Sequence, residues 1–100
     1  MSAMTKFQLF LLNENGEIRV HAKYDQDKPA FLEHVNVVEL DASSAVVGTY
    51  STVVRDYFGP GQGTNFLFAH TPSGTNVKQV KATACYINID QVAVSNTVAL

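Results

Sequence analysis

LNENGEIRVHAKY, residues 12–24, is the stretch that decides the fold, because it has the pattern of a β-hairpin. Asn15-Gly16 is the pair that best tolerates a positive φ at both central positions of a two-residue type I′ turn. This turn fixes the register of the strands on either side of it. One face is then apolar and the other mixed, as expected for a sheet packed on a core from one side. The predicted pairs are Leu11–Val20, Leu9–Ala22 and Phe7–Tyr24 on the apolar face, and Leu12–Arg19, Phe10–His21 and Gln8–Lys23 on the mixed face.

The composition predicts one domain, residues 1–100, with an unusually uncharged surface. Hydrophobic residues make up 46% of the chain and charged residues only 16%, whereas about 25% is the average for charged residues in soluble domains. Ser, Thr, Asn and Gln fill most of the difference. Because interface cores are depleted in charge, this balance favours a surface that is partly covered by copies of the same chain. An ordinary small domain of Val- and Thr-rich strands is the alternative.

Charge and hydropathy exclude several classes of partner. The net charge is −2, with both signs interspersed, which argues against binding to duplex DNA or to an anionic membrane. No run of 18 apolar residues is present, and the apolar stretch at 7–12 is too short for a secretory signal. The single cysteine, Cys85, excludes an intrachain disulfide and is compatible with a reducing compartment. We therefore expect a cytoplasmic or virion-associated protein.

Residues 43–58 are predicted as a helix, although their Val- and Thr-rich composition is typical of strands. Asp41, Ser43 or Ser44 could cap its first turn, and Gly59-Pro60 could end it. A pair of strands is the alternative. With further strands expected at about 35–40, 65–69 and 76–88, the fold class is α+β: a mostly antiparallel sheet or small barrel of five or six strands with one helix near residues 43–58. The apolar positions spaced by three and four are Val46, Val47, Tyr50, Val53, Val54, Tyr57 and Phe58.

The chain contains no motif that indicates catalysis or a cofactor. His21, His34 and His70 stand alone in sequence, without the short-range partners typical of metal ligands. Cys85 lies in a strand pattern without a neighbouring cation or base, so an inert thiol is the better interpretation. The loop GPGQGT at 59–64 follows the predicted helix, which is the wrong order for a phosphate-binding loop. No metal, cofactor or small-molecule ligand is predicted.

Three functional hypotheses remain. The first is a non-catalytic interaction or assembly module, homo-oligomeric through strand edges or the apolar side of its sheet; a small structural or accessory protein, for instance of viral type, has such a composition. The second is a small barrel that binds single-stranded nucleic acid through aromatic side chains and a modest basic groove. The third is a small dimeric α+β enzyme with His70 or His34 as its acid–base group. The nucleic-acid hypothesis involves Phe10, Arg19, His21, Lys23, Tyr24, Lys78 and Lys81.

Overall fold

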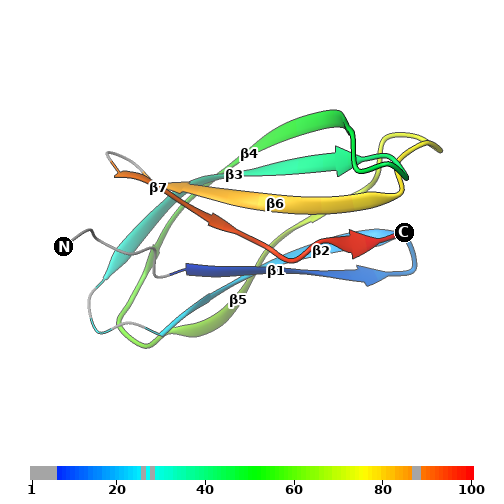
Figure 1. Cartoon of the computed structure of the whole chain (residues 1–100). Coiled ribbons are helices and arrows are strands. Elements are labelled where there is room, and N and C mark those ends of the chain that lie inside the picture. The colour runs from blue at the N-terminus through cyan, green and yellow to red at the C-terminus, as the bar shows by residue number, and fades with distance from the viewer. Residues whose placement is uncertain (1–6, 26, 28, 87–88) are drawn as a thin grey trace.

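The computed structural model of the chain describes residues 7–25, 27, 29–86 and 89–100. The described residues contain β-strands and no helix. The strands form two antiparallel sheets in two layers (Figure 1). The three-stranded sheet has the order β1 (Phe7–Glu14), β2 (Glu17–Tyr24), β5 (Gly63–His70). The five-stranded sheet has the order β4 (Val46–Phe58), β3 (Ala30–Leu40), β6 (Gln79–Tyr86), β7 (Ile89–Val94), and β8 (Val98–Ala99) also pairs with β6.

The strand order is that of an immunoglobulin-like sandwich. β1, β2 and β5 take the places of strands A, B and E, and β4, β3, β6 and β7 those of C′, C, F and G. The buried tryptophan and inter-sheet disulfide of antibody domains have no counterpart, because the chain has no tryptophan and one cysteine. The likeness is therefore one of topology, and topology alone does not specify a function.

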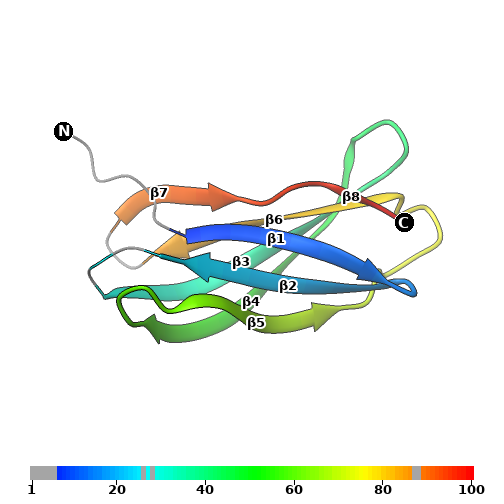
Figure 2. The same ribbon diagram turned by 90° about the horizontal axis from the view of Figure 1, so that it is seen from below.

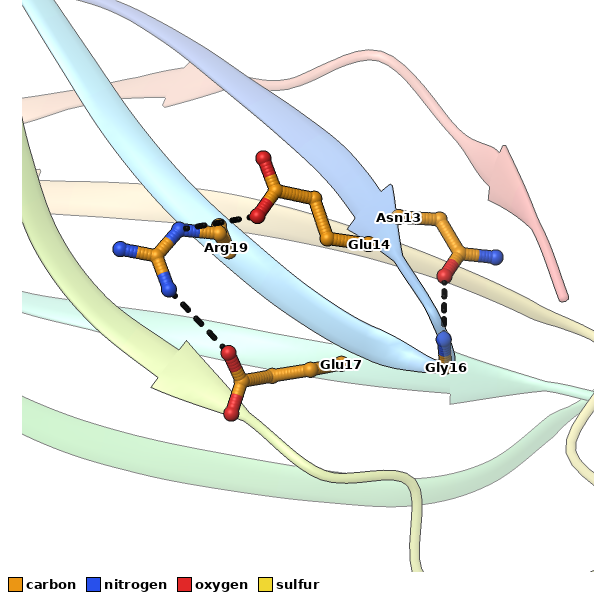
Figure 3. Close-up of polar contacts among 5 residues, drawn as sticks. All are labelled: Asn13, Glu14, Gly16, Glu17 and Arg19. Atoms are coloured by element: carbon orange, nitrogen blue, oxygen red, sulfur yellow. Dashed lines mark hydrogen bonds and ion pairs between the residues drawn. The ribbon is translucent and has the colours of Figure 1, made fainter.

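The β1–β2 hairpin confirms the register predicted from its turn. All six predicted pairs are present, among them Leu11 opposite Val20. Asn15 and Gly16 have φ angles of 57° and 87°, as a type I′ turn requires. The side chain of Asn13 also accepts a hydrogen bond from the Gly16 N–H at 2.9 Å (Figure 3). Local turn chemistry thus sets which face of this hairpin is buried.

The core lies between the two sheets and draws side chains from both. Each fully buried valine or leucine stabilises the fold by about 1.5–3 kcal/mol relative to an exposed one. The buried cluster contains Leu9, Leu11, Ile18, Val20, Ala22 and Tyr24 from the hairpin, Leu32, Val35 and Val37 from β3, Val80, Ala82 and Ala84 from β6, and Phe58 and Val77.

The predicted α+β fold class is wrong, because residues 43–58 form no helix. The chain turns at 41–45 and then continues as the single strand β4. The Asp41 carboxylate accepts hydrogen bonds from the backbone N–H groups of Ser43 (2.8 Å) and Ala45 (3.0 Å). Side chains that cap helices also accept hydrogen bonds in turns. Asp41 therefore does bind free backbone N–H groups, but in the turn of the β3–β4 hairpin and not at the start of a helix.

The helical spacing in this segment has a different physical cause. Of its seven apolar side chains only Phe58 is buried, and Val46, Val53 and Tyr57 are 62%, 61% and 76% exposed. The register between β3 and β4 shifts twice, once near each end of β4. Each shift adds a residue to β4 and changes the phase of its alternation, so the apolar residues on either side of a shift do not follow a strict period of two. Arg55, with φ 51°, lies in the second irregularity.

The other predicted strands are present, but their predicted bounds differ from the observed ones. The strands expected at 35–40 and 65–69 are confirmed within β3 and β5. The strand expected at 76–88 begins only at Gln79 as β6, and residues 87–88 lie outside the described residues.

Candidate functional site

The edge of β4 is an unpaired strand edge that carries exposed apolar side chains. β4 is the first strand of its sheet and pairs with β3 alone. No charged residue and no proline occurs between Val46 and Val54. Isolated edge strands usually carry such residues, because unpaired N–H and C=O groups recruit other strands. The exposed apolar side chains on this stretch are Val46, Val47, Tyr50 and Val53.

Irregularities in β4 are confined to its two ends. Between them, residues 48–53 pair with β3 in an unbroken register. At the far end, the Arg55 side chain forms an ion pair with Glu33 at 3.2 Å, which holds the irregular segment against β3. The regular part of the edge is therefore flanked, not interrupted, by bulges.

On the opposite side of the sandwich, the C-terminal segment bonds to the edge of β1. The side-chain amide of Asn96 accepts a hydrogen bond from the Leu11 N–H at 2.9 Å and donates one to the Leu11 carbonyl at 3.3 Å. Asn13 donates a further bond to the Ala99 carbonyl at 3.1 Å. The Asn96 amide thus pairs with β1 as a neighbouring strand would. β4 and β5 are the edge strands of the two sheets on the other side (Figure 2).

The outer face of the three-stranded sheet carries a row of aromatic rings. The rings of Phe10 and His21 stack at 5.3 Å, and Phe66 meets His21 edge-on at 5.5 Å. The guanidinium group of Arg19 lies 4.3 Å from the centre of the Phe66 ring. Nε2 of His21 is buried and has no hydrogen-bond partner within the described part of the chain. Lys23 is exposed on the same face of β2.

Two glutamates reduce the positive charge of this face. Arg19 forms ion pairs with Glu17 at 3.1 Å and with Glu14 at 3.7 Å (Figure 3). The cation over the Phe66 ring is therefore already balanced by carboxylates on its own hairpin, which weakens any attraction for phosphate groups.

The residues predicted for nucleic-acid binding do not form one surface. Phe10, Arg19, His21 and Lys23 share the outer face of the three-stranded sheet, but Tyr24 is 1% exposed and points into the core. Lys78 directly precedes β6 and Lys81 lies within it, in the other sheet.

Phe66 belongs to the aromatic row but was not predicted. The alternation of side chains along residues 63–70 places it on the outer face, and this was the signal that could have found it.

A buried carboxylate joins the two sheets at the end where β3 turns into β4. Glu39 of β3 has no exposed surface. Its Oε2 atom lies 2.7 Å from Nε2 of His70 and accepts a hydrogen bond from the Ser73 N–H at 3.0 Å, while the Ser73 hydroxyl donates to Oε1 at 2.5 Å. A carboxylate only accepts hydrogen bonds, so Nε2 of His70 carries the hydrogen. The Tyr50 ring packs against His70 with centres 5.2 Å apart.

The surroundings of Glu39 favour its charged form. Burial acts to raise the pKa of the Glu39 carboxyl, but the hydrogen bonds from Ser73 and His70 outweigh burial, and the net result is a pKa lowered from its ordinary value. The cluster resembles a serine–histidine–carboxylate triad only in composition. In a triad the histidine lies between the other two groups and activates the hydroxyl. Here the carboxylate lies between them, so the Ser73 hydroxyl donates to Glu39 and is not activated by His70.

The remaining candidate residues are dispersed. His21, His34 and His70 belong to three different strands. His34 lies opposite Cys85 in the β3–β6 register, and the Cys85 side chain, predicted to be an inert thiol, lies outside the described residues. Among the described residues no three His, Cys, Asp or Glu side chains are grouped as metal ligands would be.

A cavity of about 310 Å³ lies at the opposite end of the sandwich from Glu39. It is lined by the end of β4, the β4–β5 loop and the start of β5, and no histidine is among the lining residues. The acid–base candidates and the cavity are thus separate features.

A scan against protein-family models, a search of curated proteins and a search of solved structures each found no match to this chain. Among the described residues there is no helix that is long and apolar enough to cross a membrane.

Proposed function

We propose that the chain is a non-catalytic assembly module that associates with copies of itself through the edge of β4. The observation that carries the proposal is the absence of charge and proline from Val46 to Val54 on a strand with one unpaired side. A strand of 13 residues is about 43 Å long when extended, and the long dimension of the molecule is 41 Å. Of this length, the part in regular register, residues 48–53, covers about 20 Å.

The geometry favours antiparallel pairing of two β4 edges. Such pairing is isologous, because the same surface is used on both subunits, and it closes with twofold symmetry. The unpaired N–H and C=O groups of each edge would gain partners, as in other cases of strand addition. Exposed side chains such as Val53 and Tyr50 would at the same time lose contact with water, at about 25 cal/mol for each Å² of apolar surface buried.

The arrangement of polar groups supports a role without catalysis. The Ser73 hydroxyl is engaged by a carboxylate, and His70 is only 13% exposed and lines no described cavity. A structural or accessory role in the cytoplasm or in a virion fits such a module, on composition alone.

The native mass tests the proposal. Light scattering after gel filtration should give twice the chain mass of 10.9 kDa, unchanged by salt, because backbone pairing and apolar burial hold the assembly together. Val53→Lys places a charge on the edge and should give the mass of a single chain. Leu12→Lys is the matched control: Leu12 is 45% exposed on the other sheet, and its substitution should leave the mass unchanged. A wild-type protein that stays monomeric at high concentration would refute the proposal.

Binding of single-stranded nucleic acid is a second candidate, favoured by the stacked Phe10 and His21 rings and by Phe66, which is 47% exposed. Bases stack on such rings, and their affinity falls steeply with salt. Fluorescence anisotropy with a labelled oligonucleotide at low salt should then show binding that Phe66→Ala weakens. If no binding occurs at low salt, this candidate is excluded.

A further inference from the structure

The turn of the β1–β2 hairpin contains the single Asn-Gly pair of the sequence, Asn15-Gly16. Both residues are exposed, with φ angles of 57° and 87°. A Cβ atom placed on Gly16 would meet nothing within 4 Å. Because glycine has no side chain, other groups can approach its backbone closely. The backbone nitrogen of Gly16 is therefore open to the side-chain carboxamide of Asn15, which directly precedes it in the chain.

We propose that Asn15 is a site of spontaneous deamidation in which the Gly16 backbone nitrogen is the nucleophile. This nitrogen gives up its proton to the solvent and forms a bond to the Cγ atom of Asn15. The bond from Cγ to the side-chain nitrogen then breaks, and ammonia leaves with a proton returned by the solvent. Water opens the resulting succinimide ring at either carbonyl, which gives an aspartate or an isoaspartate at position 15.

The Asn13 side chain controls the rate of this reaction, because it binds the proton that the Gly16 nitrogen must lose. Its Oδ1 atom accepts a hydrogen bond from the Gly16 N–H at 2.9 Å (Figure 3). Its Nδ2 atom donates to the Ala99 carbonyl at 3.1 Å, so the amide is held at both ends. Loss of the proton would replace this attraction by repulsion between Oδ1 and a negatively charged nitrogen. Deamidation therefore requires the hydrogen bond to Asn13 to open first.

Deamidation would disturb the hairpin in two ways. An isoaspartate adds a methylene group to the main chain, which changes the geometry of the two-residue turn and the register that depends on it. Either product also adds a carboxylate between Glu14 and Glu17, which already share Arg19 as their partner (Figure 3). Like charges on facing strands are destabilising. The pair that sets the register is thus also the pair through which the hairpin is lost.

Mass spectrometry of proteolytic peptides tests this site after incubation of the full chain at mildly alkaline pH and physiological temperature. Aspartate and isoaspartate should accumulate at position 15. Asn76 and Asn96, which do not precede a glycine, are internal controls and should stay unmodified. Asn13→Ala should accelerate the reaction about ten-fold, the factor that corresponds to a hydrogen bond of ~1.4 kcal/mol. Asn13→Asp keeps the acceptor for the Gly16 N–H and should react no faster than the wild type.

The same chain in urea gives the reference rate at which Asn15 reacts without the turn, and circular dichroism checks that each variant is folded. Three results would overturn the deamidation proposal. They are the absence of product at position 15 in both the wild type and Asn13→Ala over many half-lives of the reference reaction, equal rates in these two proteins, and a rate in Asn13→Asp that matches Asn13→Ala. None of them bears on the native mass, so the assembly proposal is judged separately.

Discussion

Glu39 is a charged side chain without exposed surface, and hydrogen bonds from His70 and Ser73 compensate for its burial. Its partners come from the end of β5 and the loop that follows, so the carboxylate ties the two sheets together. Removing a partner from a buried polar group costs more than the bond itself is worth, because the remaining group loses its hydration without replacement. This residue therefore controls stability at its end of the sandwich.

Glu39→Gln is expected to lower the free energy of unfolding by about 1–3 kcal/mol. The amide keeps one acceptor but presents an NH₂ group to a donor, either His70 or Ser73. Urea denaturation followed by circular dichroism measures the change. Glu33→Gln on the same strand is the control: its partner Arg55 is exposed, and about 1 kcal/mol or less is expected. Equal losses in the two variants would contradict this role for Glu39.

The lowered pKa of Glu39 predicts how stability depends on pH. The folded-state pKa lies below the ordinary value of 4.5, so the unfolded chain binds the proton more readily. The contribution of Glu39 is therefore fully present above 4.5 and is lost as pH falls through the lowered pKa. Urea midpoints measured from neutral pH to well below 4.5 should fall on the acid side, and fall less in Glu39→Gln. An identical acid loss in both proteins would assign the effect to other groups.

The Glu39 cluster could not be predicted from the sequence. His70 and Ser73 are 31 and 34 residues away from Glu39, and no short motif marks them. Buried side chains in β3 also depart from strict alternation between Leu32 and Val35. For this reason neither face of residues 30–40 reads as the core face.

Among the elements, the β1–β2 hairpin and β4 show when local sequence decides structure and when it does not. The hairpin register follows from Asn15-Gly16 and from alternation within the same few residues, and all of it could be predicted. β4 could not, because its state depends on its place at a sheet edge and on bulges set by pairing with β3. Because β4 is an edge strand, most of its apolar residues stay exposed. Their spacing in the sequence is not a strict alternation and therefore resembles the apolar face of a helix.

Closure of the β1 edge by Asn96 is also invisible in sequence, because Asn96 and Leu11 are 85 residues apart. Asn96→Ala removes both hydrogen bonds and should lower the free energy of unfolding by about 1–3 kcal/mol. Hydrogen exchange of the Leu11 amide, measured by NMR, should accelerate at the same time. The control is Asn76→Ala, at an exposed loop position, where neither quantity should change. Unaltered exchange at Leu11 in Asn96→Ala would show that the amide is protected in another way.

At the scale of the whole molecule, the C-terminal segment bonds to the β1 edge on one side of the sandwich, and β4 and β5 are the edge strands on the other side (Figure 2). The low charge of the sequence suggested contact between copies, and we propose the edge of β4 as the place of that contact. The cavity at the β4–β5 end of the sandwich could not be anticipated, because its lining comes from Asp56–Phe58 on one sheet and Asn65-Phe66 on the other. These segments meet only when the chain crosses between sheets.

Assembly through β4 predicts that thermal stability depends on protein concentration. A protein whose folded form associates gains stability by mass action, so its Tm should rise with concentration. Differential scanning calorimetry of the wild type should show this rise, and Val53→Lys should show none. A constant Tm in the wild type, together with a multimeric mass, would mean that association does not stabilise the fold.

In the proposed assembly, the Asn96 amide on β1 also limits the number of copies that can associate. A sandwich with an unpaired strand edge on each side could add further copies indefinitely and form a fibril. Here the hydrogen bonds of Asn96 already occupy part of the β1 edge, so the proposed association would use residues 48–53 of β4 in both subunits. The Asn96 amide thereby favours a closed dimer over an open-ended fibril.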